Sequence, residues 1–125
     1  MLRVDSPYTY YLLGFWSRGT LPRDFILAGM KYFAVSYDYN PANPEIAKVR
    51  PAHREFTGKL FDEGTIVASG PLTDSQGGAL IVVRFDGDDT QVADVIQLMN
   101  DDPFYQQGCL RGRSFREWNP VKARF

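Results

Sequence analysis

The sequence has very few of the residues that usually carry metal or thiol chemistry. It contains a single histidine, His53, and a single cysteine, Cys109, in 125 residues. One cysteine cannot form an intrachain disulfide, and nothing indicates a secreted, disulfide-stapled fold, so the cytoplasm is the expected compartment. One histidine and one cysteine also cannot supply the usual zinc ligand set, and the carboxylates lack metal-loop spacing. No metal site is therefore predicted.

Charge of one sign and long apolar runs are also missing. The 14 basic and 15 acidic side chains leave a formal net charge of -1. Nucleic-acid binders usually show a basic excess, so nucleic acid is not an expected partner. No apolar run reaches the roughly 18 residues that a membrane-spanning helix needs. The composition, 44% hydrophobic and 14% aromatic, is instead that of one globular domain.

The first 29 residues differ from the rest of the chain. The segment "YTYYLLGFW" is apolar and aromatic but short, and the turn-like "SRGTLPRD" follows it. A signal peptide is not predicted, because only Arg3 gives a basic start and the small residues of a cleavage site are missing. We predict an extension over 1–29 and a folded domain over 30–125. The extension is weakly ordered, packs its aromatic residues on a partner subunit, or comes from an upstream start codon.

Turn-forming residues divide the predicted domain into strands and helices in a clear order. We predict strands over 31–39, 65–72, 79–85 and 109–118, and helices over 51–63 and 91–100. Pro51 suits a first helical turn, so the first helix is expected to start at Arg50–Pro51, and Gly64 ends it. The segment "DDPFYQQG" is predicted to be a loop, because Pro103 disfavours helical geometry at Asp102.

This order is β-α-β-β-α-β, the ferredoxin-like arrangement of the α+β class. It predicts a four-stranded antiparallel sheet with both helices on one face, which leaves the other face open. The strands carry apolar residues in both registers, for example Val35 against Ala34 and Val82 against Ile81. Both faces therefore need cover, and a second copy of the sheet would supply it. A homodimer with two sheets packed face to face is predicted.

The candidate functional residue is His53. It follows Val49 by four residues and precedes Phe56 by three, so it lies on the apolar stripe of the first helix that faces the sheet. One interpretation is a core histidine bonded to a backbone carbonyl. The other is a reactive imidazole set into a pocket, with Arg50 one turn earlier on the same side.

The acidic pair Asp101–Asp102 also has two interpretations. An aspartate before a proline is a common turn residue, and acidic loop residues are mostly solvated. If one of the pair contacts His53, it would fix the imidazole tautomer, as suits a general base or acid. Sequence spacing permits this contact without showing it.

Three other features of the sequence are weaker candidates for a functional role. Arg111 and Arg113 alternate onto one face of the last predicted strand, opposite Arg116, where they bind a substrate carboxylate or, as we expect, are solvated edge charges. Cys109 has no partner for thiol chemistry and is predicted to be a buried apolar residue, not a nucleophile. Gly77–Gly78 lacks the spacing of a phosphate loop and is predicted to be a turn.

The segment "VRPAHREFTGKLFDEGTIVASGPL", followed later by "DDPFYQQG", resembles the YciI (YCII-related) family of small bacterial proteins. The marks are the R-P-x-H helix, the D/E-x-G helix end, the A/S-G-P strand end and the D-P-[FY]…G loop. The resemblance covers residues 30–125. It implies a dimeric α/β barrel similar in fold to muconolactone isomerase. It also implies an active-site dyad, here His53 and Asp102, with Arg50 beside it.

One position departs from the family pattern. Some members have a hydroxyl residue at the start of the third strand, where this chain has Gly77–Gly78–Ala79. Ser69, Ser75 or a tyrosine of the first strand could supply a hydroxyl instead. Ser69 is therefore taken with Arg50 as a candidate substrate-binding residue.

The resemblance implies a small dimeric enzyme, a lyase or isomerase, that transfers a proton on a small cyclic organic anion. Lactone isomerisation, or an elimination such as dehydrochlorination of a hydroxyquinol, fits this. His53 would be the general base or acid, Asp102 would orient it, and Arg50 would neutralise oxyanion charge. Neither a metal nor an organic cofactor is needed for such chemistry. The alternative is a non-catalytic dimeric ligand-binding or accessory protein, which the missing hydroxyl favours.

Overall fold

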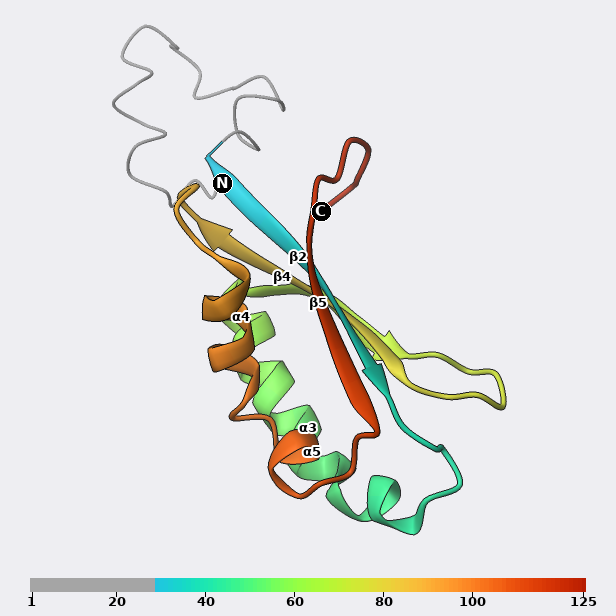
Figure 1. The fold of residues 1–125 in the computed structure, drawn as a ribbon. Helices are drawn as coiled ribbons and strands as arrows, with labels where there is room; N and C mark the ends of the chain where they lie inside the picture. Colours follow the sequence, from blue (N-terminus) through green and yellow to red (C-terminus); the bar gives the residue numbers. More distant parts are fainter. Residues whose placement is uncertain (1–28) are drawn as a thin grey trace, which may run out of the picture.

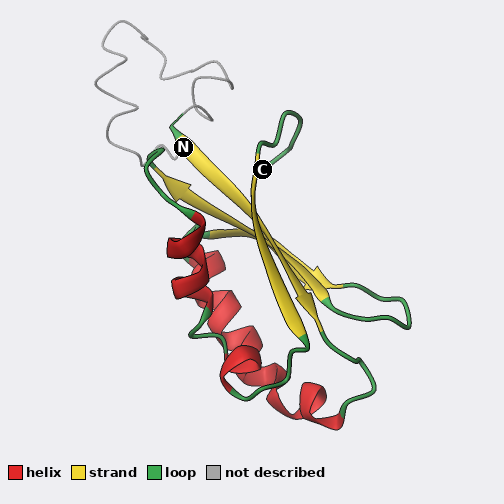
Figure 2. Ribbon diagram, in the orientation of Figure 1, coloured by secondary structure: helices red, strands yellow, loops and turns green. Residues whose placement is uncertain are grey.

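The computed structural model describes residues 29–125, and the strands and helices in this range follow the predicted order (Figure 1). The elements are β2 (Met30–Asp38), α3 (Pro44–Asp62), β3 (Ile66–Pro71), β4 (Ala79–Asp86), α4 (Val92–Met99), α5 (Pro103–Gln106) and β5 (Gly112–Trp118). The strands form one sheet in the order β3-β4-β2-β5 with every neighbouring pair antiparallel. Figure 2 shows all three helices on one side of this sheet. The predicted ferredoxin-like fold is confirmed.

The hydrophobic core lies between the sheet and the helices. Successive side chains of a strand point to opposite faces, so Phe33, Val35 and Tyr37 of β2 share the helix-facing side. Each of them is at most 3% exposed. The other buried residues of this cluster are Tyr39, Ile46, Leu60, Ile66, Ala79, Ile81, Val83, Val95, Met99, Phe104 and Cys109. The burial predicted for Cys109 is confirmed, and burial raises the pKa of its thiol.

Helix α3 begins earlier than predicted. Asn43 caps it by accepting a hydrogen bond from the backbone N–H of Glu45, and Pro44 occupies the first helical position. The prediction of a start at Arg50–Pro51 was therefore wrong. The sequence offers two prolines that suit a first turn, and the asparagine cap before Pro44 decides between them. The predicted stop is confirmed, since Gly64 has a φ of 85°, where a side chain would be strained.

The segment predicted as a loop after α4 contains a short helix. Asp102 has extended backbone angles, as its position before a proline requires, and its side chain caps the single turn of α5. The last strand also begins later than predicted, at Gly112 instead of Cys109. The chain uses residues 107–111 to pass from the end of α5 to the sheet edge, and Cys109 within this connection is buried among core side chains.

The second face of the sheet carries no helix. Tyr32 and Val82 on this face are buried in a smaller cluster with Met30, and the ring of Phe125 lies 5.9 Å from that of Tyr32. Further along the face, Leu80 is 44% exposed. The open face is therefore apolar at both ends and is covered at only one of them.

Two findings concern the rest of the chain. The extension predicted over 1–29 lies, except for Gly29, outside the described residues. No helix within residues 29–125 is both long enough and apolar enough to cross a membrane.

Candidate functional site

His53 faces the sheet because its neighbours on the apolar stripe do. Leu60 is buried, and Val49 and Phe56 pack against the same core. The imidazole lies within this row and is 13% exposed. Its ring stacks on Phe104 of α5 at 4.1 Å between centroids and an angle of 13°. Stacking on one side fixes the plane of the imidazole.

The partner of His53 is Asp102, 49 residues further along the chain. Its carboxylate oxygens lie 2.9 Å and 3.0 Å from Nδ1 of His53. The same carboxylate accepts a hydrogen bond from the backbone N–H of Phe104 at 2.9 Å and one from the hydroxyl of Tyr37 at 2.8 Å. Asp102 is 0% exposed. A buried charge requires several such partners, and these three groups supply them.

This geometry determines the tautomer of the imidazole. An ionised carboxylate can only accept hydrogen bonds, so Nδ1 of His53 carries the hydrogen that points at Asp102. In the neutral ring the lone pair then belongs to Nε2. Within residues 29–125, no side chain or backbone group is hydrogen-bonded to Nε2. His53 therefore presents an unoccupied proton acceptor.

Tyr37 supports the pair from the sheet. Burial, followed by the negative charge of Asp102 and the hydrogen bond to it, raises the pKa of Tyr37 well above its usual range. The nearby guanidinium of Arg113 opposes this rise. The phenol is accordingly neutral and donates to Asp102. Tyr37 thus holds the carboxylate from the side opposite the helix.

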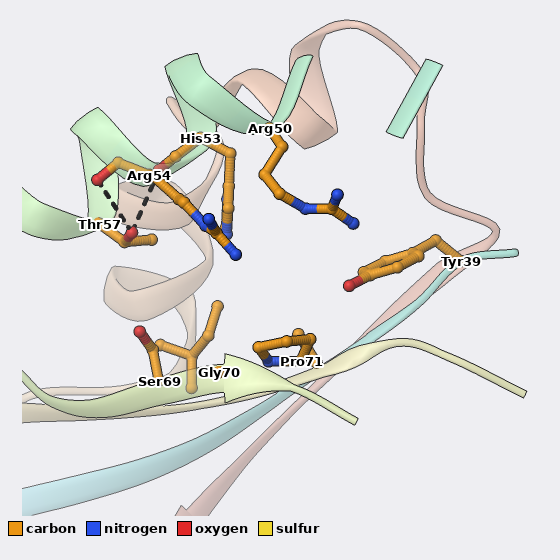
Figure 3. A pocket seen from close by; sticks show the side chains of 10 residues that line it. Tyr39, Arg50, His53, Arg54, Thr57, Ser69, Gly70 and Pro71 are labelled. Atoms are coloured by element: carbon orange, nitrogen blue, oxygen red, sulfur yellow. Dashed lines mark hydrogen bonds between the residues drawn. The ribbon is translucent and has the colours of Figure 1, made fainter. Parts of the chain in front are cut away.

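A cavity of about 170 Å³ opens beside His53, between α3 and the strands β3 and β4. Figure 3 shows Arg50, His53 and Arg54 reaching into it from the helix, opposite Ser69 and Pro71. Its other lining residues are Tyr39, Thr57, Gly70, Ala79 and Ile81. Asp102 is not among them, because it lies behind the imidazole. The structure therefore brings His53, Arg50 and Ser69 to one cavity and places Asp102 in contact with the histidine.

Ser69 reaches the cavity because β3 is irregular. Ile66 and Ser69 are three residues apart and would point to opposite faces of a regular strand. A register shift lies between Ile66, which pairs with Val83, and Ala68, which pairs with Val82. The extra residue returns Ser69 to the helix-facing side.

Three further residues of the site were not assigned a role from the sequence. Arg54 lies one turn after Arg50, and this spacing was the available signal. Tyr37 and Tyr39 belong to the segment expected to supply a hydroxyl, but the sequence did not single out either. In Figure 3 the hydroxyl of Tyr39 points toward the cavity. That of Thr57 is already occupied, since it donates to the backbone carbonyl of His53.

The glycine pair before β4 explains the missing hydroxyl in part. Gly77 and Gly78 have φ values of 78° and 90°. A Cβ on Gly78 would collide with the backbone oxygen of Tyr37. The predicted turn is therefore confirmed, and neither glycine position accepts a serine or threonine. Ala79, next in sequence, lines the cavity without a hydroxyl.

The remaining candidates lie away from this cavity. Asp101 is exposed, as expected of a solvated loop residue. Arg111 precedes β5 and pairs with Asp38 at the surface. The expectation that Arg113 is a solvated edge charge was wrong. Its guanidinium lies 3.6 Å over the ring of Tyr105 and donates to the side chain of Asn100 at 2.8 Å, because its position on β5 faces the helices.

Within the described range, no three histidine, cysteine, aspartate or glutamate side chains gather closely enough to hold a metal ion. What the site offers is an oriented imidazole, two guanidinium groups and two hydroxyls around a space the size of a small organic molecule. The fold and the site thus define a small α+β domain with a polar, cationic cavity that contains one candidate proton acceptor.

The comparisons with known proteins agree with this fold. The family model of the YCII-related domain matches residues 30–119. This is well over half of the chain, and the protein therefore belongs to the YCII-related domain family, as the resemblance of its motifs implied. A search of curated proteins gives no match.

Several solved structures are similar. 5-Chloro-2-hydroxyhydroquinone dehydrochlorinase (TftG) from Burkholderia phenoliruptrix AC1100, in complex with 2,5-dihydroxybenzoquinone, matches with a TM-score of 0.57 and 18% identity over 70% of this chain and 93% of that chain. An antibiotic biosynthesis monooxygenase has a TM-score of 0.43 and 16% identity, over 73% and 99% of the two chains. The C-terminal domain of MgtC from Mycobacterium tuberculosis has 0.43 and 13%, over 77% and 96%. At these identities the likeness extends to the fold alone.

Proposed function

We propose that this protein is an enzyme that transfers a proton on a small cyclic organic substrate, in an isomerisation or an elimination, through His53 and Asp102. One observation carries the proposal. The only imidazole of the chain lies in the wall of a cavity, and a fully buried carboxylate holds its Nδ1. A structural histidine needs a hydrogen-bond partner, but it does not need a second ring nitrogen kept free beside a cavity.

In the proposed reaction Nε2 of His53 takes a proton from a carbon or hydroxyl group of the bound substrate. The electron pair of the broken bond passes into the conjugated ring and leaves negative charge on an oxygen. The resulting imidazolium is stabilised by Asp102, which stays ionised. Arg50 stabilises the oxygen charge. Returning the proton at another atom completes an isomerisation, whereas loss of chloride with the electron pair of its carbon–chlorine bond completes a dehydrochlorination.

One neighbour in fold supports the second outcome. TftG is named a dehydrochlorinase of a chlorinated hydroxyquinol, and its structure holds 2,5-dihydroxybenzoquinone. A planar ring with several oxygens suits a cavity lined by guanidinium, imidazole and hydroxyl groups. We therefore include hydroxyquinols and hydroxyquinones, together with lactones, among the proposed substrates.

Proton exchange tests this proposal before the natural substrate is known. Lactones, hydroxyquinols and cyclic ketones are incubated with the protein in D₂O, and deuterium incorporation is followed by NMR. We expect wild type to accelerate exchange in at least one compound. His53→Gln should abolish the acceleration, and Asp102→Asn should reduce it by roughly 10²–10⁴-fold, the usual contribution of general acid–base catalysis. Exchange that is equal in wild type and His53→Gln would remove His53 from the reaction.

A second candidate function is non-catalytic ligand binding, as an accessory protein. The observation that favours it is Ala79, which lines the cavity where some family members have a hydroxyl. In this case a ligand raises the melting temperature of wild type and of His53→Gln equally, and no compound exchanges deuterium.

We also propose that two copies of the chain pair through the open face of the sheet. The apolar side chains of Leu80 and Trp118 on this face are 44% and 38% exposed, and a second copy presents the same residues in return. A cytoplasmic location remains a prediction from the cysteine content.

A further inference from the structure

The cavity beside His53 holds two positive charges that form no ion pair within residues 29–125. Arg50 and Arg54 both line it, one helical turn apart on α3. Neither guanidinium forms an ion pair with any carboxylate of residues 29–125. The other lining residues are all uncharged apart from His53 itself. The arginine Arg111, by contrast, has Asp38 at 2.8 Å.

The charges of the site indicate what it accommodates. Asp102 contributes one negative charge, and the two guanidinium groups contribute two positive ones, so the site with a neutral imidazole has a net charge of one positive. When His53 takes a proton, its charge cancels that of Asp102 and the site has a net charge of two positive. A substrate that enters with one negative charge and loses a proton to His53 neutralises the site before and after the transfer.

We propose that the substrate is a small cyclic monoanion that becomes a dianion when His53 removes its proton. It carries one fixed anionic group, a carboxylate or an acidic ring hydroxyl, beside a conjugated carbonyl or phenol. The proton moves from substrate to Nε2, and its bonding pair remains on the substrate as a second negative charge on oxygen. This inference rests on the proposed proton transfer and adds the charge and the anchoring group of the substrate.

Arg50 and Arg54 differ in their exposure to solvent, and we assign them different roles on this basis. Arg54 lines the cavity and is exposed to solvent, so it can capture the fixed anion of an arriving substrate. Arg50 is half-buried, and Figure 3 shows its guanidinium and the hydroxyl of Tyr39 on the same side of the cavity. Charge interactions strengthen as water is excluded. Arg50 and Tyr39 are therefore the groups that stabilise the new oxygen charge.

A series of ring compounds that differ only in charge tests the assignment without turnover. Benzamide is neutral, benzoate carries one charge, and phthalate carries two on adjacent positions, as the deprotonated substrate would. Binding is measured by isothermal titration calorimetry at low salt and at about pH 6, where an ordinary imidazole is largely protonated, because the site has two net positive charges only with a protonated His53. With wild type we expect no detectable binding of benzamide, measurable binding of benzoate, and binding of phthalate about tenfold tighter than benzoate.

Single variants separate the two positions. Arg54→Gln should weaken benzoate and phthalate alike, by about tenfold each, whereas Arg50→Gln should keep benzoate and lower phthalate to the affinity of benzoate. Lys48→Gln is the matched control. It removes a positive charge from an exposed position of the same helix outside the cavity, and it should leave all three affinities unchanged.

Equal affinity of wild type for benzoate and phthalate would overturn the inference, as would equal losses of both probes in Arg50→Gln. Either result would mean that the two arginines share a single anion. These outcomes are distinct from failure of the proposed function, which is read from deuterium exchange and from His53→Gln. Normal exchange with a flat charge series rejects the dianion alone, and an intact charge series without exchange rejects the proton transfer.

Discussion

At the scale of single residues, the site depends on one buried carboxylate. Asp102 accepts hydrogen bonds from an imidazole, a phenol and a backbone N–H, which belong to α3, β2 and α5. Its side chain therefore orients His53 and also caps the short helix whose Phe104 stacks on the same imidazole. The same carboxylate therefore has the catalytic role that we propose and a structural role.

Tyr37→Phe tests the support that the sheet gives to this carboxylate. The substitution removes one donor to a buried charge, and we expect it to lower the free energy of unfolding by about 1.5–3 kcal/mol at pH 8. The pKa of Tyr37 is raised in the folded protein, mainly by burial. Above about pH 10 the unfolded chain loses this proton while the folded chain keeps it, so this contribution to stability declines by about 1.4 kcal/mol per pH unit.

The measurement is urea unfolding of wild type and Tyr37→Phe between pH 8 and pH 11, with the tested range set by the ordinary tyrosine pKa of about 10. The stability difference between the two proteins should shrink above pH 10. Tyr39→Phe is the control for the hydrogen bond and is compared at pH 8, because Tyr39 is as buried as Tyr37, at 3% exposed, but has no hydrogen bond to Asp102. A difference that stays constant with pH would contradict the burial of a neutral phenol.

At the scale of elements, two local irregularities lie beside the site. The first is Pro51 inside α3, between Arg50 and His53. A proline here removes the hydrogen bond to the carbonyl four residues earlier, and its ring crowds that carbonyl. The second is the extra residue in β3 that turns Ser69 toward the cavity.

Pro51→Ala should make the protein more stable. Alanine restores the missing helical hydrogen bond, worth up to about 3 kcal/mol, and a more flexible unfolded chain offsets this by about 0.4–1 kcal/mol. We expect a net gain of about 1–2 kcal/mol in the free energy of unfolding, measured by chemical denaturation. Pro44→Ala is the matched control and should give no such gain, since a first-turn proline loses no helical bond. If Pro51→Ala were less stable than wild type, the contacts of the proline ring would stabilise the protein by more than the missing hydrogen bond costs.

These irregularities mark the limit of what the sequence predicted. The spacing of Val49, His53 and Phe56 was sufficient to place the imidazole toward the sheet, because a helix repeats regularly. The start of α3 was not predictable from Pro51 alone, since a proline marks a helix start only when no stable cap precedes it. The direction of Ser69 was not predictable either, because alternation along a strand fails across a bulge.

Contacts between distant segments set the other limit. The pairing of His53 with Asp102 followed from motif resemblance, and spacing alone left it open, because no local pattern joins two residues 49 positions apart. A tyrosine hydroxyl of the first strand was expected near the site. The contact of Tyr37 with Asp102 was not predictable, for the same reason. The position of Arg54 beside the cavity, by contrast, was predictable from the sequence, because it lies one helical turn after Arg50.

At the scale of the whole molecule, the helices cover one face of the sheet, and the proposed second copy covers the other. Wild type should then sediment as a dimer in sedimentation velocity experiments, and Leu80→Lys should sediment as a monomer. The reason is that a lysine at this position would bury an unpaired charge in the interface. Leu72→Lys is the matched control. Leu72 is 52% exposed in the connection between β3 and β4, outside the sheet, and this variant should keep the mass of wild type. A wild-type chain that sediments as a single copy would contradict the pairing.

The most direct test of the central claim is the protonation of the two ring nitrogens of His53. Because the chain has one histidine, uniform ¹⁵N labelling gives the signals of this imidazole without assignment by mutation. At about pH 9, where an ordinary imidazole is neutral, we predict a hydrogen on Nδ1, held by Asp102, and none on Nε2. In Asp102→Asn the population should move toward Nε2–H. A wild-type imidazole with its hydrogen on Nε2, or an even mixture of the two tautomers, would contradict the account of His53 as an oriented proton acceptor.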